Sequence, residues 1–301
     1  MPSVKSSKAR SREMRTVTAC RIGSTALMAS ERYLACAILA GVTADRDWTA
    51  KFDRTFAAKP GAEGSVQSRI WMEVLGDEYP VELSPHSYIT RTELERFARE
   101  LELGPADLFA DLACGEGGPG LWIARMTGAR LVGLDISKVA LESAARTSAA
   151  MGLADRCRWV EGSFEATGLE HASVDAAMSV DALLFSPDKN AAIREIARII
   201  RPRGRLVFTS FDYTGRPVGR PAQVSDHQPL LKEAGFRILA YEETEDWHHR
   251  LKATGDALLA AADELAAESG EDPGTVEAEV REMTETLAFV SRRVFVVAER
   301  H

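Results

Sequence analysis

From residue 106 onward the sequence alternates short apolar runs with longer helical runs, and this alternation constrains the fold more than any other feature. A chain of this kind builds a mainly parallel sheet that helices cover on both faces. We therefore predict an α/β, doubly wound, seven-stranded sheet. Its strands are predicted at Asp107–Ala113, Arg130–Ile136, Arg158–Ser163, Val174–Val180, Arg205–Phe211, Arg237–Glu243 and Arg293–Ala298.

Helical segments surround and interrupt this alternation. A capping box at Thr90–Glu93 predicts a helix before the first strand, and Ser186-Pro187 predicts the start of another. Two amphipathic helices are expected between the last two strands. The predicted organisation is a poorly ordered basic tail at 1–45, a helical N-terminal lid at 46–105, and a core at 106–301 with a helical insertion at 247–290.

Composition narrows the choice of partners. The net charge of −8 disfavours a nucleic-acid-binding surface, which needs clustered Lys and Arg. The longest apolar stretch, Tyr33 to Val42, is too short for a membrane span of ~20 residues. The four isolated cysteines show no metal-site spacing and are typical of reduced, cytoplasmic thiols. We expect a small-molecule partner and no metal; the oligomeric state stays open, with a homodimer among the alternatives.

A glycine-rich loop follows the first predicted strand and leads into a helix, over the residues Asp111-Leu-Ala-Cys-Gly115-Glu-Gly117-Gly-Pro-Gly120. Glycine lets the backbone turn tightly and lets a ligand approach, and helix N-terminal amides favour a negative group. The spacing also satisfies the dinucleotide fingerprint, which is weak by itself.

Three observations favour S-adenosylmethionine over a nicotinamide cofactor. Asp111 precedes the first glycine by four residues, where it can serve an ammonium group. Asp135 ends the next predicted strand, where it can hold ribose hydroxyls. The glycine loop also begins more than a hundred residues into the chain, whereas a dinucleotide fold usually begins with it.

Over roughly residues 65–299 the chain resembles class I S-adenosylmethionine-dependent methyltransferases, in particular the small-molecule enzymes of bacterial natural-product pathways. The motifs that carry the resemblance are Asp111–Gly117, Leu134–Ser137, Val174–Asp181 and Ile193–Phe211. The resemblance implies a Rossmann-like methyltransferase sheet with an antiparallel last strand and a helical lid. It also implies cofactor contacts at Asp111, Gly115, Gly117, Asp135, Ile136, Ser163, Phe164 and Ser179. Ser163 departs from the pattern, because the family commonly has an acid there.

Acceptor residues are expected at the carboxyl ends of the strands and in the lid. They are Tyr88, Asp181, Phe185, Phe211, Tyr213 and Trp247. His248, after the sixth strand, and His86, before the capped helix, are the candidate general bases, whereas His227 is expected to open a surface helix. Methyl transfer mainly requires positioning, exclusion of water and, for a hydroxyl, removal of a proton.

The sequence thus predicts a methyltransferase of secondary metabolism, such as antibiotic biosynthesis, with O-methylation ahead of N- or C-methylation. One alternative is a relative that binds the cofactor but catalyses a cyclisation without methyl transfer. The other alternative, which the loop context disfavours, is an NAD(P)-dependent oxidoreductase.

Overall fold

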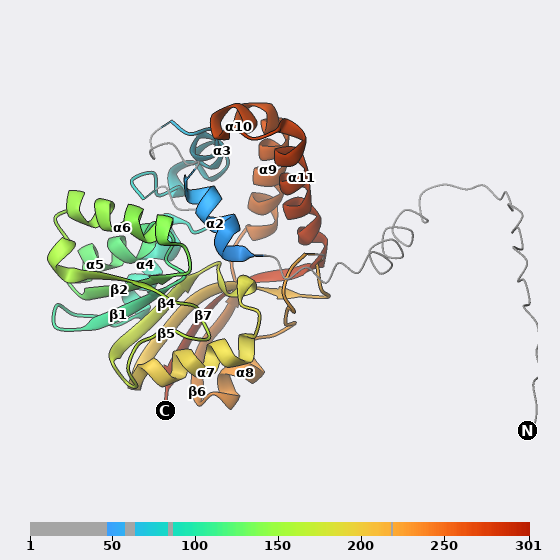
Figure 1. Ribbon diagram of the computed structural model, residues 1–301. Helices are drawn as coiled ribbons and strands as arrows, with labels where there is room; N and C mark the ends of the chain where they lie inside the picture. Colours follow the sequence, from blue (N-terminus) through green and yellow to red (C-terminus); the bar gives the residue numbers. More distant parts are fainter. Residues whose placement is uncertain (1–46, 58–63, 84–86, 218) are drawn as a thin grey trace, which may run out of the picture. The chain divides into compact units, whose positions relative to one another are not determined.

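One seven-stranded sheet forms the centre of the computed structural model, which describes residues 47–57, 64–83, 87–217 and 219–301 (Figure 1). The predicted tail at 1–45 lies outside the described residues. The strand order is β3-β2-β1-β4-β5-β7-β6. The strands are β1 (Leu108–Leu112), β2 (Arg130–Asp135), β3 (Cys157–Glu161), β4 (Val174–Val180), β5 (Ile200–Tyr213), β6 (Phe236–Glu243) and β7 (Val290–Arg300).

Strands β1 to β5 pair in parallel, and β7 runs antiparallel to both of its neighbours, β5 and β6. All seven predicted strands are present, and the antiparallel last strand is confirmed. The strand order reverses between β1 and β4, so the connections after these strands leave in opposite directions. A crevice at their carboxyl ends is the expected ligand site of such a sheet.

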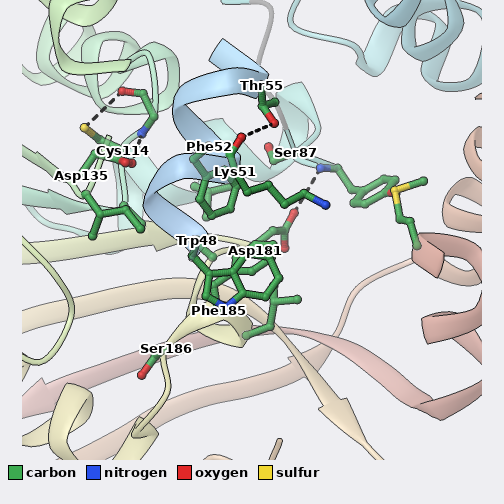
Figure 2. Close-up of a pocket in the computed structure, with 18 of the residues that line it drawn as sticks. Trp48, Lys51, Phe52, Thr55, Ser87, Cys114, Asp135, Asp181, Phe185 and Ser186 are labelled. Atoms are coloured by element: carbon green, nitrogen blue, oxygen red, sulfur yellow. Dashed lines mark hydrogen bonds between the residues drawn. The ribbon is translucent and has the colours of Figure 1, made fainter. Parts of the chain in front are cut away.

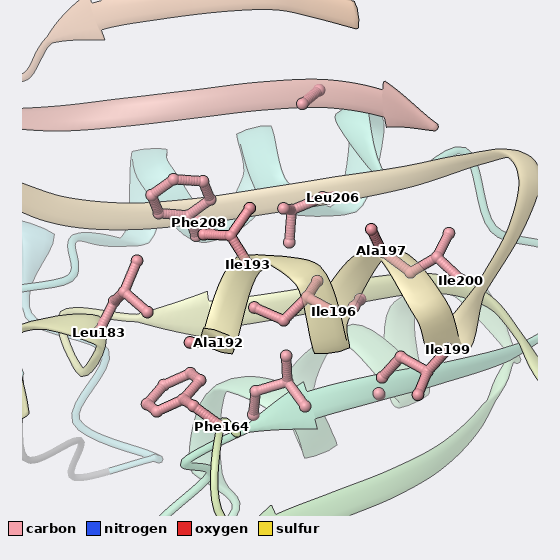
Figure 3. Close-up of a cluster of buried hydrophobic side chains, with 14 of the residues drawn as sticks. Phe164, Leu183, Ala192, Ile193, Ile196, Ala197, Ile199, Ile200, Leu206 and Phe208 are labelled. Atoms are coloured by element: carbon pink, nitrogen blue, oxygen red, sulfur yellow. The ribbon is translucent and has the colours of Figure 1, made fainter. Parts of the chain in front are cut away.

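Alternate residues of the central strands face two separate apolar layers. On one face, Ala110 and Leu206 belong to the cluster that includes Ile193 and Ile196 of α7 (Lys189–Ile199) (Figure 3). On the opposite face, Phe109 belongs to a cluster with residues of α4 (Arg91–Glu100) and α5 (Gly118–Thr127). Both faces are buried at the centre of the sheet, which explains why β1, β2 and β4 are mainly apolar.

Two helix starts were predicted, and the structure confirms one of them. Thr90 and Glu93 form the capping box that opens α4. Helix α7 begins later than predicted. The side chain of Asp188, and not that of Ser186, accepts hydrogen bonds from the first backbone amides of the helix. Ser186 Oγ instead donates to Glu165 Oε1, at 2.5 Å.

A second helical layer lies beyond the carboxyl edge of the sheet (Figure 1). It contains α2 (Trp48–Ala57), α3 (Val66–Leu75), α9 (Trp247–Ala260), α10 (Ala262–Ser269) and α11 (Pro273–Thr286). The insertion between β6 and β7 therefore holds three helices where two were expected. Helix α4 does not join this lid, because Phe97 packs on Phe295 of the sheet with ring centroids 5.0 Å apart.

The remaining helices are short or lie beside the sheet: α6 (Lys138–Ala150), α8 (Gln228–Glu233), η1 (Gly76–Glu78), η2 (Ala154–Arg156), η3 (Leu183–Phe185) and η4 (Leu287–Phe289). Within the described part of the chain, none of the helices has both the length and the apolar character needed to cross a bilayer.

Candidate functional site

A cavity of about 490 Å³ lies where the carboxyl ends of β1, β2, β4 and β5 meet the second helical layer. Figure 2 shows Trp48 and Phe52 of α2 on one side of it, with Asp181 and Phe185 facing them. The cavity has a polar end at the loops after β1 and β2 and an apolar end against α3, α9 and α11. This division matches a site for two different ligands.

The glycine loop forms the wall of the polar end. Gly115 lines the cavity with φ +53°, a conformation that favours glycine, and its N–H donates to Asp135 Oδ2 at 2.8 Å. Gly117 does not line the cavity. A Cβ there would lie 2.6 Å from the Trp159 ring, so packing and a φ of +81° account for this glycine. The predicted contact of Gly117 with a ligand is therefore not supported.

Asp111 is the most unusual side chain of the polar end. It lines the cavity yet is 2% exposed, and its Oδ2 has no hydrogen-bond partner among the described residues. Burial raises the pKa of its carboxyl to about 8, and the backbone N–H of Gly120 offsets part of that cost. Such a group is suited to a cationic ligand, because a positive charge would stabilise its ionised form.

Asp135 has its own backbone partners. Oδ1 accepts from Ser137 N at 2.9 Å and Oδ2 accepts from Gly115 N at 2.8 Å. Burial raises the pKa of this carboxyl, and those amides oppose the shift. A carboxylate has about four acceptor positions, so these amides leave acceptor capacity for a hydroxyl group in the cavity. The cap of α6 is Ser137, whose Oγ accepts from Ala140 N.

The other predicted cofactor residues divide into two groups. Ile136, Ser163 and Phe164 line the cavity. Ser179 does not, because its Oγ donates to Leu112 O at 2.9 Å and joins β4 to β1 inside the sheet. Glu165, which the sequence analysis missed, also lines the cavity and accepts from Ser186. Glu165 could have been predicted from the sequence, because it directly follows the predicted cofactor residues Ser163 and Phe164.

Helix α2 covers the cavity. A helical lid was predicted over this part of the chain, but none of the cavity-lining residues of α2 was. Trp48, Phe52 and Phe56 follow one another at helical spacing, and a Cβ on Gly115 would lie 3.2 Å from Phe56. Phe185 contacts Trp48 and Phe52, with ring centroids 4.9 and 5.0 Å apart. The spacing of these aromatic residues in the sequence was the signal that could have identified this face.

Polar contacts hold α2 at both ends of the cavity. Ser137 Oγ donates to Asp53 Oδ1 at 2.6 Å, which joins α2 to the polar end. Lys51 Nζ lies 3.7 Å from Glu279 of α11, across the apolar end. One helix thus contacts both halves of the cavity.

The apolar end contains four of the predicted acceptor aromatics, Tyr88, Phe185, Phe211 and Tyr213. Trp247 is the exception: it packs on Phe211 and its Nε1 donates to Glu243 at 2.6 Å, so it belongs to the core beneath the cavity. The prediction that Trp247 lines the site is wrong.

Asp181 lines the cavity at the end of β4, with a backbone φ of +50°. Its carboxylate is bound by the fully buried Arg293, with Oδ1 2.9 Å from Nε and Oδ2 3.1 Å from Nη2. Arg293 makes a second such pair with Glu93. Because both oxygens are held by a guanidinium, Asp181 is poorly placed to accept a proton from a ligand.

The histidines do not behave as expected. His248 is exposed on α9 and is not among the cavity-lining residues, so the expectation that it faces the site is wrong. His86 lies outside the described residues, although Leu83 and Ser87 on either side of it line the cavity. His227, expected at the surface, is 1% exposed.

Ser210, His227 and Asp212 have the contacts of a nucleophilic triad. His227 Nδ1 lies 2.9 Å from Asp212 Oδ1, and Nε2 lies 3.4 Å from Ser210 Oγ. All three are buried away from the cavity, and Asp212 also pairs with Arg292. The network is therefore structural: it fixes the end of β5, from which Phe211 and Tyr213 reach the acceptor end.

Known proteins resemble this chain in sequence over the core of the sheet. Residues 110–208 match the family model described as a methyltransferase domain. Methyltransferase GfsG of Streptomyces halstedii is 28% identical over 64% of this chain and 74% of its own length. The 27-O-demethylrifamycin SV methyltransferase of Amycolatopsis mediterranei is 26% identical over 70% of this chain and 73% of its own length. The chain spans only 55% of the sterol 24-C-methyltransferase of Eremothecium gossypii, at 25% identity over 62% of this chain.

Solved structures share the fold at low sequence identity. The [4+2]-cyclase SpnF superposes with a TM-score of 0.61 at 22% identity, over 69% of this chain and 80% of its own. The geranyl diphosphate C-methyltransferase of Streptomyces coelicolor A3(2), in complex with Mg²⁺, geranyl diphosphate and S-adenosyl-L-homocysteine, gives 0.55 at 16% identity, over 79% and 100%.

The residues of the polar end fit S-adenosylmethionine chemically: a buried carboxyl with one unpartnered oxygen for an ammonium group, a second carboxyl for ribose hydroxyls, and a glycine loop that lines the cavity. Together with the matched domain and the relatives, this fit establishes the kind of enzyme. The protein is an S-adenosylmethionine-dependent methyltransferase that resembles those of class I, and S-adenosylmethionine is its cofactor.

Proposed function

We propose that this enzyme transfers the methyl group to a hydroxyl oxygen of an apolar, ring-containing small molecule of natural-product metabolism. The observation that carries the proposal is the apolar end of the cavity, where aromatic and aliphatic side chains from α2, α3, α9, α11 and the ends of β4 and β5 outnumber charged ones such as Lys51, Glu279 and Glu282. A lining of this kind suits a large, weakly polar acceptor better than a small charged metabolite. The rifamycin relative, whose name specifies an oxygen, supports O-methylation.

The polar end has a distinct role in this proposal. Asp111 binds the ammonium group of S-adenosylmethionine and Asp135 binds the ribose hydroxyls, while Gly115 leaves room for the ligand beside the loop. Ile136, Ser163 and Phe164 surround the adenine, with Glu165 as an additional polar contact. When bound, S-adenosylmethionine supplies an activated methyl group on a sulfonium.

Positioning and exclusion of water are the main tasks of the protein. Trp48, Phe52 and Phe185 are half-buried and contact one another at the wall of the cavity. The rings of Trp48 and Phe185 already stack with a cation, since Arg220 Cζ lies 5.3 and 4.9 Å from their centroids. An in-line transfer held in this geometry gains most of its rate from orientation.

Removal of the hydroxyl proton is the remaining step, since it must accompany formation of the oxygen–methyl bond. Among the described residues, the cavity lining contains no histidine, and Asp181 is held by Arg293. His86 stays a candidate base. An acidic acceptor hydroxyl, such as a phenol, would need less help, because its own ionisation supplies the nucleophile.

A product assay tests the proposal. The protein is incubated with S-adenosylmethionine carrying a trideuterated methyl group and with a panel of phenolic, macrocyclic and sterol-like acceptors. We expect a mass gain from one labelled methyl, equimolar S-adenosylhomocysteine, and a methoxy carbon in the NMR spectrum. The Asp111→Asn variant serves as the matched control with impaired cofactor binding.

Other outcomes of this assay have definite meanings. A new methyl on carbon, as the name of the sterol relative would suggest, refutes O-methylation but keeps methyl transfer. Conversion of an acceptor without S-adenosylhomocysteine refutes methyl transfer altogether and favours the cyclisation that the name of SpnF describes. The cytoplasmic location and the oligomeric state stay predictions.

A further inference from the structure

Two phenol groups lie among the mostly apolar side chains of the acceptor end of the cavity, whose lining also includes the charged Lys51, Arg220, Glu279 and Glu282. Tyr88 and Tyr213 both line it, and both belong to the cluster of side chains around Phe211 and Leu251. Among the described residues, the Tyr88 hydroxyl has one hydrogen-bond partner, the Met283 sulfur at 3.9 Å, and the Tyr213 hydroxyl has none. A thioether is a weak acceptor, so both hydroxyls retain most of their capacity to donate.

Each phenol is fixed by its backbone and its ring. Tyr88 N donates to Asp181 Oδ2 at 3.2 Å, and its ring lies 6.0 Å from that of Trp71. Tyr213 N donates to Val224 O at 2.9 Å, and its ring lies 6.5 Å from that of Phe211. The two donors are therefore held in place before a ligand enters, which lowers the entropy cost of using them.

Both phenols stay uncharged over the physiological pH range. Burial and the nearby Asp181 raise the pKa of Tyr88 far above its ordinary value, and burial raises the pKa of Tyr213 to about 12. A neutral phenol in an apolar wall donates to oxygen but offers no charge to an ion. The matching ligand atoms are carbonyl, ether or hydroxyl oxygens.

We infer that Tyr88 and Tyr213 determine acceptor specificity by donating hydrogen bonds to two oxygen atoms on an apolar ring system. This inference rests on the proposed function and narrows its acceptor class. The acceptor carries at least two oxygens, one toward Tyr213 at the end of β5 and one toward Tyr88, whose hydroxyl lies beside Met283 of α11. A pure hydrocarbon of the same size leaves both donors unpaired and binds less well.

Equilibrium dialysis with two probes of similar size tests the inference. The probes are 2-acetyl-1-naphthol, with two neighbouring oxygens, and 2-ethylnaphthalene, with none. The protein is saturated with S-adenosylhomocysteine throughout. We expect the unaltered protein to bind the oxygenated probe at least tenfold more tightly. Tyr88→Phe and Tyr213→Phe should each reduce its affinity by about three- to tenfold while leaving the hydrocarbon within about twofold.

Tyr79→Phe is the matched control, because it removes a phenol hydroxyl that does not line the cavity. Its ratio of the two affinities should equal that of the unaltered protein. The inference is overturned if the unaltered protein does not prefer the oxygenated probe, or if the two phenylalanine variants keep the ratio. Equal losses for both probes also overturn it, since they indicate a change of shape and not of hydrogen bonding.

Calorimetry with S-adenosylhomocysteine separates this inference from the function on which it rests. If the unaltered protein does not bind S-adenosylhomocysteine, the proposed function fails. If it binds that ligand and methylates an acceptor while both variants keep the probe ratio, only the role of the two phenols is refuted.

Discussion

Replacing Asp111 with asparagine should strengthen the cofactor-free protein while weakening the binding of its cofactor. The folded carboxyl has a pKa of about 8 against an ordinary value of 3.8. Between these values the unfolded chain has released a proton that the folded chain keeps, so the stability of the cofactor-free protein falls as pH rises from 4 to 8. At pH 7 this penalty is roughly 4 kcal/mol.

Asparagine does not titrate, so the stability of the Asp111→Asn variant should not show this fall between pH 4 and 8. Burying an unpaired amide costs ~1–2 kcal/mol, which leaves a net gain of about 2–3 kcal/mol at pH 7. Urea unfolding at pH 5, 6, 7 and 8 measures this directly. Asp155→Asn, at an exposed aspartate, is the matched control and should change little.

Cofactor binding provides the second half of the same test. An ammonium group beside Asp111 favours the ionised carboxylate, so binding should release a proton and its affinity should rise from pH 6 to 7.5. Loss of this charge-assisted contact should weaken binding by about 10- to 100-fold. Calorimetry in two buffers of different ionisation enthalpy counts the proton. An affinity that does not depend on pH, together with an asparagine variant that matches the unaltered protein, would refute the assignment.

Three further predictions concern the cofactor loop and the histidines. Asp135→Ala should weaken S-adenosylmethionine binding at least tenfold, because it removes hydrogen bonds worth ~1.5–3 kcal/mol; unchanged calorimetric affinity in a folded variant would contradict this. Gly120→Ala should abolish binding and lower the melting temperature, since its Cβ would lie 2.5 Å from Asp111 Oδ2; a wild-type melting curve would argue against it. His248→Ala should leave turnover within about twofold, whereas His86→Ala should slow it ~10²-fold or more if His86 is the base, and equal rates would exclude both.

Local rules explain why much of the fold could be predicted from sequence. The alternation of apolar runs with amphipathic helices predicted all seven strands, because the central strands are buried on both faces and are therefore mainly apolar. Asp111, Gly115 and Asp135 were identified because the ends of neighbouring parallel strands necessarily meet at one edge of the sheet. The capping box at Thr90 is equally local, since its hydrogen bonds join residues three apart.

Long-range contacts decided the rest. Gly117 and Ser179 have the sequence context of ligand contacts, but Trp159 and Leu112, distant in the chain, occupy the space beside them. Asp246 has a left-handed backbone conformation, and helix α9 leaves it in a direction that places His248 in solvent.

The lid shows the same division between sequence and structure. Its amphipathic spacing could be seen in the sequence, but the partner of each apolar face could not. Helix α2 is held over the cavity by the contact of Phe52 with Phe185 and by the hydrogen bond from Ser137 to Asp53. Asp181 is held by Arg293, which lies 112 residues further along the chain. Local spacing determines which secondary structure forms and which residues reach the edge of the sheet. Only tertiary packing decides which of those residues stay open to a ligand, because neighbours far away in the sequence compete for the same side chains.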